Sequence, residues 1–321
     1  WFGPTEDIEP ITEPFPLAKR KENHWCWQPL AMPTLPNATD PAWSRNAIDD
    51  FIAHAREKID LKNAPDADRH TLARRLYFAI IGLPPTPDQL DAFLSDPRDD
   101  NEAIAALATQ LLDSPHFGER WGRHWLDLVR YAESRGHEYD HTTPNPWHYR
   151  DYVIRAFNAD LPFNEFFIEH VAGDLLPHPR TDENNSANES ILGTGFWYLG
   201  DWIHSPTDIR ADEMERIDNQ IDVFGRAFLG LTIACARCHD HKFDAISSHD
   251  YYALAGYLQS SSYRQVRFDT MIDNQRIAKT IWANRKNLFA DVTERLQADW
   301  QTNKKRISTE LLAGLLTPES S

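Results

Sequence analysis

The sequence of 321 residues predicts an all-α fold, with an extended proline-rich segment before it and a long helical arm after it. Apolar residues recur every three or four positions through most of residues 45–312, which is the period of an amphipathic helix. No segment alternates as a strand would, and no internal repeat is present. We therefore expect an N-terminal segment over 1–44, a multi-helix domain over 45–264 and a helical arm over 265–321.

The segment 1–44 has no regular apolar period, and it ends in Pro33, Pro36 and Pro41. Proline fixes φ and lacks a backbone N–H, so it does not suit a helix interior. We predict that this segment runs extended along a domain surface. Trp25 and Trp27 are the side chains expected to anchor it.

Helical periodicity begins near residue 45. A stop signal of glycine and proline at residues 82–85 is followed by Thr86, Pro87 and Gln89, the pattern of a capping box with a first-turn proline. A break rich in glycine and proline also covers 135–147. The helices expected in the domain cover residues 46–58, 72–81, 102–112, 117–133, 147–158, 163–172, 189–199, 208–234 and 249–258.

The segment 275–312 has apolar residues close to heptad spacing within a highly charged sequence, which is typical of a coiled coil or a projecting helix. A helix of that length would measure roughly 57 Å, more than a small domain can cover. We predict that it projects and packs on a further domain, a partner chain or a second helix. The alternative is a helix broken near Asn284 or Asn303 and folded back.

The composition indicates a globular protein, because 41% of the residues are hydrophobic and 11 are Trp. With 33 basic and 49 acidic residues the net charge is −16, which argues against nucleic acid and anionic membrane surfaces as partners. No apolar run approaches the roughly 18 residues of a membrane span. Because the chain begins at Trp1 without a signal peptide, we expect a mature protein or an excised fragment.

Residues 235–239 read Cys-Ala-Arg-Cys-His, the pattern at which c-type haem is attached. Two thiols three positions apart on a helical turn can bond to the two vinyl groups of one porphyrin, and the following imidazole can bind its iron. We therefore predict a covalent haem c on Cys235 and Cys238, with His239 as the metal ligand.

Other readings of this motif are two buried thiols or a zinc site. Zinc needs four ligands, and Cys235, Cys238, His239 and His241 are too close in sequence to surround one ion without a partner segment. A thioredoxin-like dithiol would need a βαβ context, and the flanks here are helical. If Cys235 and Cys238 hold haem, no cysteine is left to pair with Cys26. We therefore expect the Cys26 side chain to be buried like a small hydrophobic residue.

Several polar residues are candidates for binding the haem or for catalysis beside it. His241 and Lys242 follow the motif and are expected to bind the cofactor. His241 would bond to a haem propionate, a carboxylate or a backbone carbonyl, and Lys242 would pair with a propionate, although both also fit an ordinary surface pair. His137, Glu138 and His204 lie in loops dense in polar groups and are the candidate catalytic residues. We predict that the two loops converge near the distal face of the haem.

Segments spread over most of residues 24–264 carry a resemblance to a known family. They are His24-Trp25, Gln28-Pro29, Arg74-Arg75-Leu76-Tyr77, Gly82 to Pro87, Ser114 to Trp121, His124 to Asp127, Arg130 to Ser134, Tyr149-Arg150-Asp151, Asp160 to Phe163, Phe224 to Thr232 and Cys235 to Asp244. In these segments the chain resembles the second type of the planctomycete cytochrome-like PSCyt proteins, a domain of unknown function. The resemblance implies a neighbouring cytochrome c-like domain before this one and a further C-terminal domain, missing here, after the arm.

Together these observations predict an all-α haem c domain of a larger redox protein. We expect a periplasmic or otherwise extracytoplasmic oxidoreductase or electron-transfer module, because c-type haem is attached outside the cytoplasmic membrane. Its expected partners are the cytochrome c-like domain or protein and a small-molecule or glycan substrate. The alternative is a binding or scaffolding domain without catalysis, in which haem or zinc is a structural staple.

Overall fold

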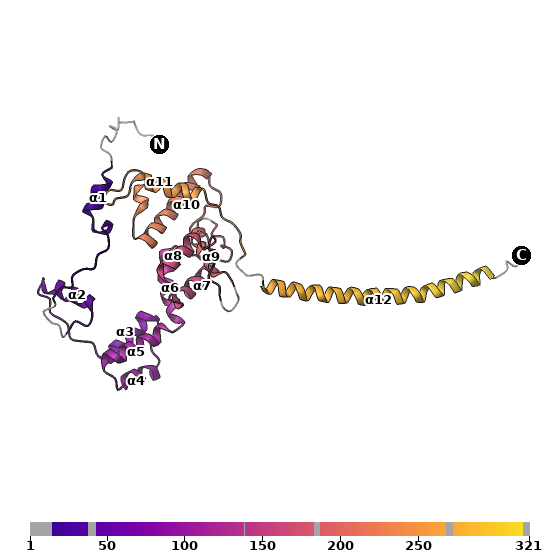
Figure 1. The fold of residues 1–321 in the computed structure, drawn as a ribbon, viewed down its shortest axis with the longest axis horizontal. Coiled ribbons are helices and arrows are strands. Elements are labelled where there is room, and N and C mark those ends of the chain that lie inside the picture. Colours follow the sequence, from indigo (N-terminus) through magenta and orange to yellow (C-terminus); the bar gives the residue numbers. More distant parts are fainter. Residues whose placement is uncertain (1–14, 38–42, 138, 183–186, 268–271, 317–321) are drawn as a thin grey trace, which may run out of the picture. The chain divides into compact units, whose positions relative to one another are not determined.

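The structure is a computed structural model that describes residues 15–37, 43–137, 139–182, 187–267 and 272–316 (Figure 1). It divides into two units. The first comprises residues 1–177 and 190–264, and the second comprises 178–189 and 265–321. The first unit contains the Cys235–His239 motif.

The described residues form α-helices and shorter helical turns without a β-strand, which confirms the predicted all-α class. The α-helices are α1 (Leu17–Asn23), α2 (Ala47–Glu57), α3 (Arg69–Ile80), α4 (Pro87–Leu94), α5 (Asp100–Leu112), α6 (His116–Leu128), α7 (Trp147–Asn158), α8 (Phe163–Ala172), α9 (Glu189–Gly193), α10 (Ile209–Phe224), α11 (Ser248–Gln259) and α12 (Ile272–Leu316). The shorter turns are η1 (Trp25–Trp27), η2 (Thr194–Tyr198), the π turn η3 (Gly225–Leu229) and η4 (Ile233–Ala236).

The described residues of the first unit form three apolar cores. One lies among α3, α4 and α5, where Tyr77 is fully buried. A second is built by α6, α7, α8 and η2 together with the end of α10 and η3. The third lies among α10, η4 and α11 and holds the motif in place. The Thr86–Gln89 capping box at the start of α4 is present, as predicted.

The described part of the N-terminal segment, residues 15–37, is less extended than predicted, because α1 and η1 lie within it. No proline interrupts Leu17–Asn23, so this stretch is free to form two helical turns. Trp27 packs against the third core, as an anchor should. Trp25 is 83% exposed and does not anchor the segment.

The single helix predicted over 208–234 is wrong. The α-helix stops at Phe224, continues as a π turn and ends at Gly230, whose φ of 65° reverses the chain. Leu231 then donates its N–H to the Gly225 carbonyl at 3.0 Å. A side chain at Gly225 would lie 2.8 Å from the Leu231 carbonyl oxygen, so this close return needs glycine. As a result η4 packs back against α10.

Helix α12 runs without a break through Asn284 and Asn303, so the long C-terminal helix is confirmed. Every side chain described along it is exposed, including the apolar Leu288 at 62% and Leu296 at 63%. Among the described helices, none combines the length and apolar character needed to cross a membrane.

Candidate functional site

The motif begins in η4 and continues through a series of bends, rather than forming the end of a long helix. Ile233 and Ala236 are buried in the third core and fix this turn on α10 and α11. Between and beyond them, Cys235 and Cys238 are free and exposed thiols. The turn therefore presents both sulfurs to solvent while its apolar side chains hold it in the fold.

Arg237, between the two cysteines, ties the motif to the neighbouring helices. Its Nη1 donates to Asp218 of α10 at 2.9 Å, and the Tyr251 hydroxyl of α11 donates to the same carboxylate at 2.6 Å. The charge of Asp218 raises the pKa of Arg237, and burial raises the pKa of Tyr251. Asp218 thus joins three elements around the motif.

His239 is exposed, and its Nδ1 lies 2.8 Å from the Asp240 carbonyl oxygen. A carbonyl only accepts hydrogen bonds, so Nδ1 carries the proton and Nε2 carries the lone pair. A backbone carbonyl on the far nitrogen is the arrangement that usually orients a metal-binding imidazole. The predicted ligand therefore has the tautomer that coordination through Nε2 requires.

His241 is 5% exposed, and both nitrogens of its imidazole form hydrogen bonds with nearby residues of the chain. Nδ1 accepts the N–H groups of Phe243 at 3.2 Å and Asp244 at 2.7 Å, so Nε2 carries the proton and donates to the Thr232 hydroxyl at 3.0 Å. Lys242 is exposed, with its ammonium 5.3 Å from the Phe243 ring centroid. Cofactor binding by His241 and Lys242 stays a prediction.

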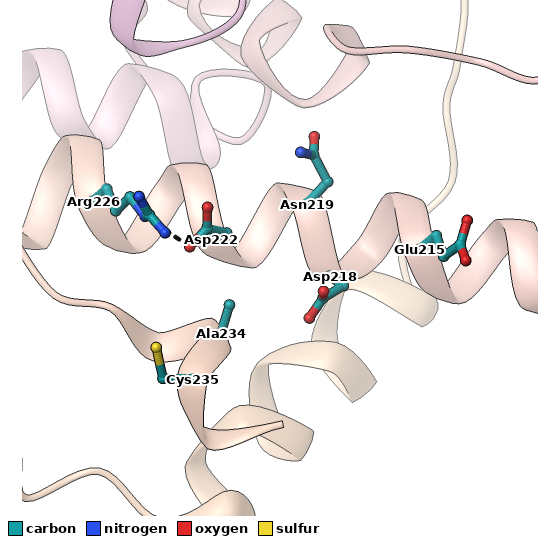
Figure 2. Close-up of a pocket in the computed structure, with 7 residues that line it drawn as sticks. All are labelled: Glu215, Asp218, Asn219, Asp222, Arg226, Ala234 and Cys235. Carbon is teal, nitrogen blue, oxygen red and sulfur yellow. Dashed lines mark hydrogen bonds and ion pairs between the residues drawn. The ribbon is translucent and has the colours of Figure 1, made fainter. Parts of the chain in front are cut away.

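A pocket of about 380 Å³ lies between α10 and η4 beside the first motif cysteine. Figure 2 shows Cys235 and Ala234 of η4 below α10 and the π turn η3, which carry the other lining residues. The pocket is lined by Glu215, Asp218, Asn219, Asp222, Arg226, Ala234 and Cys235. It exists because the chain reverses at Gly230, which brings the motif alongside α10.

The carboxylates of this pocket are partly neutralised by arginine. Asp222 of α10 accepts at 2.8 Å from Arg226, four residues on in the π turn η3, as i,i+4 neighbours can. Asp218, one turn before Asp222, accepts instead from Arg237 of the motif, at 2.9 Å.

The two loops with the predicted catalytic residues do approach each other. The backbone N–H of Trp202 donates to the backbone carbonyl of Arg135 at 3.3 Å. The His204 ring lies 4.9 Å from the Tyr139 ring and 5.9 Å from the His141 ring, measured between centroids.

His137 lies in the same loop and adopts a φ of 62°, and Glu138 lies outside the described residues. The place of these loops relative to the haem stays a prediction.

The expectation that Cys26 is buried is wrong, because its side chain is exposed beside His24.

The second core contains a chain of buried, hydrogen-bonded polar side chains that sequence reasoning missed. Trp125 donates to the Tyr149 hydroxyl at 2.9 Å, and that hydroxyl lies 2.9 Å from His170 Nε2. His170 Nδ1 bonds to the Phe166 carbonyl at 2.7 Å, so Nε2 accepts from Tyr149. Burial lowers the pKa of His170 to about 4.

The fold and the site define a helical domain that presents a free dithiol and an adjacent, oriented imidazole. The family model PSCyt2, described as a protein of unknown function (DUF1549), matches residues 47–263. This match spans more than half of the chain, and the chain belongs to that family. No curated protein and no solved structure matches it.

Proposed function

We propose that the first unit is a c-type haem domain, with the porphyrin bonded to Cys235 and Cys238 and its iron held by His239. The observation that supports it most is the state of the motif. Both thiols are exposed and unpaired with each other, and the imidazole is oriented by the Asp240 carbonyl with Nε2 left to coordinate. The two thiols and the imidazole are thus of the chemical types that would attach haem and bind its iron.

Bound haem would supply one-electron iron chemistry at this surface. The chain's own residues would hold the attachment turn rigid, through the buried side chains of η4 and the ion pair between Arg237 and Asp218. His241 would position the loop that follows, because both of its ring nitrogens bond within that loop or to Thr232. The acidic wall of α10 beside Cys235 would favour the cationic, oxidised state of a bound metal centre.

This chemistry suits an oxidoreductase or electron-transfer module outside the cytoplasmic membrane, working with a cytochrome c-like domain or protein. The net charge of −16 favours a basic partner for electron exchange. The loops of His137 and His204 are the proposed place for a small-molecule or glycan substrate. The contact of His204 with Tyr139 supports this placement of the substrate, because the Tyr139 side chain is 71% exposed and a sugar can stack on its ring.

The test is to mature the full chain in a host that attaches c-type haem and then to denature it. Haem absorbance should stay with the denatured protein, and it should be lost in the Cys235→Ala/Cys238→Ala double variant. Cys26→Ala is the matched control and should keep the haem. Wild-type protein without covalent haem after maturation would refute the proposal.

A cyanide titration of the haem protein separates catalysis at iron from electron relay. An open distal position gives a spectrum that shifts with cyanide, whereas a position filled by a second protein ligand gives a spectrum that does not. We expect the shift. An indifferent spectrum would favour electron transfer and would leave His137 and His204 without a catalytic role.

A further inference from the structure

The N-terminal segment is fastened to the loop that follows the motif. Arg20 of α1 donates to the carbonyl oxygens of His241 and Asp244, the second at 3.2 Å. Trp27 of η1 packs in the third core with α10, η4 and α11. These two anchors stand on either side of residues 24–26, so they hold that short stretch against the loop.

Between the anchors, three metal-binding side chains come together. His24, Cys26 and Asp244 each offer a ligand atom, and these atoms all lie within 4.8 Å of one another. His24 Nδ1 is 2.8 Å from Cys26 Sγ, and the Asp244 side chain is only 21% exposed. Asp244 is more than 200 positions away in sequence, so the fold, not local spacing, assembles the group.

The protonation of this cluster suits metal binding. His24 Nδ1 accepts the N–H of Cys26 at 3.4 Å, so this nitrogen carries a lone pair. The Cys26 thiol therefore donates its proton toward Nδ1 across the 2.8 Å contact. A metal ion that replaced this proton would bind the sulfur and take the Nδ1 lone pair from the long 3.4 Å contact with the Cys26 N–H.

The ligand types select the class of ion. Thiolate and imidazole bind zinc and similar borderline divalent metals, whereas magnesium and calcium prefer oxygen ligands alone. Zinc bonds of about 2.0–2.3 Å in a tetrahedron place ligand atoms roughly 3.3–3.8 Å apart, so the group needs to adjust by only about 1 Å. Thiolate and carboxylate together carry the two negative charges that balance such an ion.

We propose that His24, Cys26 and Asp244 bind one divalent transition-metal ion of the zinc type. Binding converts the Cys26 thiol to a thiolate and releases its proton to solvent. Three protein ligands leave a fourth coordination position for water. The ion would link residues 20–27 to the loop after Cys235–His239. The proposal is independent of haem, since it uses none of the motif residues.

Cobalt is the probe, because Co²⁺ in zinc sites absorbs visibly and shows a charge-transfer band when a thiolate binds it. The full chain, purified without attached haem, is titrated with Co²⁺ under reducing conditions and then competed with Zn²⁺. We expect the Cys235→Ala/Cys238→Ala variant to bind one Co²⁺ with a thiolate band and to lose the band when Zn²⁺ is added. In this double variant the motif thiols are absent, so they cannot contribute to the thiolate band.

In the same background, Cys26→Ser should abolish the thiolate band. His24→Asn and Asp244→Asn should weaken Zn²⁺ binding by at least about tenfold. His249→Asn, an exposed histidine in α11, is the matched control and should bind like its parent. A thiolate band that survives Cys26→Ser, or its absence from the parent background, would overturn the proposal. Because haem attachment is scored separately on Cys235 and Cys238, failure of either proposal is visible without the other.

Discussion

The buried chain from Trp125 through Tyr149 to His170 predicts that Tyr149→Phe destabilises the first unit strongly. The three side chains are 7%, 4% and 0% exposed, so water does not solvate them. The hydroxyl both accepts from Trp125 and donates to His170. Its removal leaves one donor and one acceptor without partners inside an apolar core, while the ring and its packing remain.

The size of the effect follows from those two orphaned groups. A buried polar group that loses its partner costs roughly 1–3 kcal/mol, and the two together about 2–5 kcal/mol. Loss of packing adds little, since phenylalanine keeps the tyrosine ring. For a unit of this size, we expect the midpoint of thermal unfolding to fall by roughly 5–15 °C.

Urea unfolding of the full chain, followed by tryptophan fluorescence and near-ultraviolet circular dichroism, measures the loss. Tyr252→Phe in α11 makes the same chemical change at a side chain that is 60% exposed, and it should change the free energy of unfolding by less than about 0.5 kcal/mol. If Tyr149→Phe costs no more than this control, the hydroxyl does not hold two buried partners and the reasoning is refuted.

Three further predictions concern pH, the chain reversal and the arm. Burial lowers the pKa of His170 from 6.5 to about 4, so between these pH values His170 is protonated in the unfolded chain and neutral in the folded chain. The free energy of unfolding should therefore fall as the pH drops through that interval, by about 3 kcal/mol in total. Gly225→Ala should destabilise by about 1–3 kcal/mol, because the new methyl meets the Leu231 carbonyl oxygen at 2.8 Å. Removal of residues 275–321 should leave the haem spectrum unchanged and lower the association seen by sedimentation, because the apolar face of α12 is exposed.

Each of these has a simple check. His170→Gln should flatten the fall of stability between pH 6.5 and 4, and an unchanged slope would contradict the assignment. Gly256→Ala in α11, where an added methyl meets nothing within 4 Å, should be neutral or slightly stabilising. Equal effects of the two glycine substitutions would show that the close return is unimportant. Loss of haem on truncation would show that the arm belongs to the haem domain.

The helices were predictable where a periodic apolar face coincides with a local start signal. Helices α7 and α8 have the predicted bounds, and α4 begins at the capping box of Thr86 and Gln89. The reversal after α10 was not predictable from periodicity, because residues 225–234 continue the apolar spacing. Only the glycines mark it, at Gly225 by close backbone approach and at Gly230 by positive φ.

The motif itself was readable from five residues, but its surroundings were not. Asp218 pairs with Arg237 only because the chain turns back. Cys26 was expected to be buried from the preference of its residue type, and no local signal reveals that Asp244 lies beside it. His170 lies one turn after Phe166 on a helix that was predicted. Its partner Tyr149 comes from α7, and the donor to Tyr149, Trp125, comes from α6. Contacts between distant segments carry this information, and sequence spacing does not.

Mass spectrometry of a protease digest tests the central proposal most directly. The full chain is matured in a host that attaches c-type haem, denatured, digested and separated, and the peptide containing residues 235–239 is weighed. We predict that this peptide carries one haem, bonded through both Cys235 and Cys238, and that no other peptide does. The same peptide recovered with two free thiols or an internal disulfide, from protein of a host shown to mature a control cytochrome, would contradict the account.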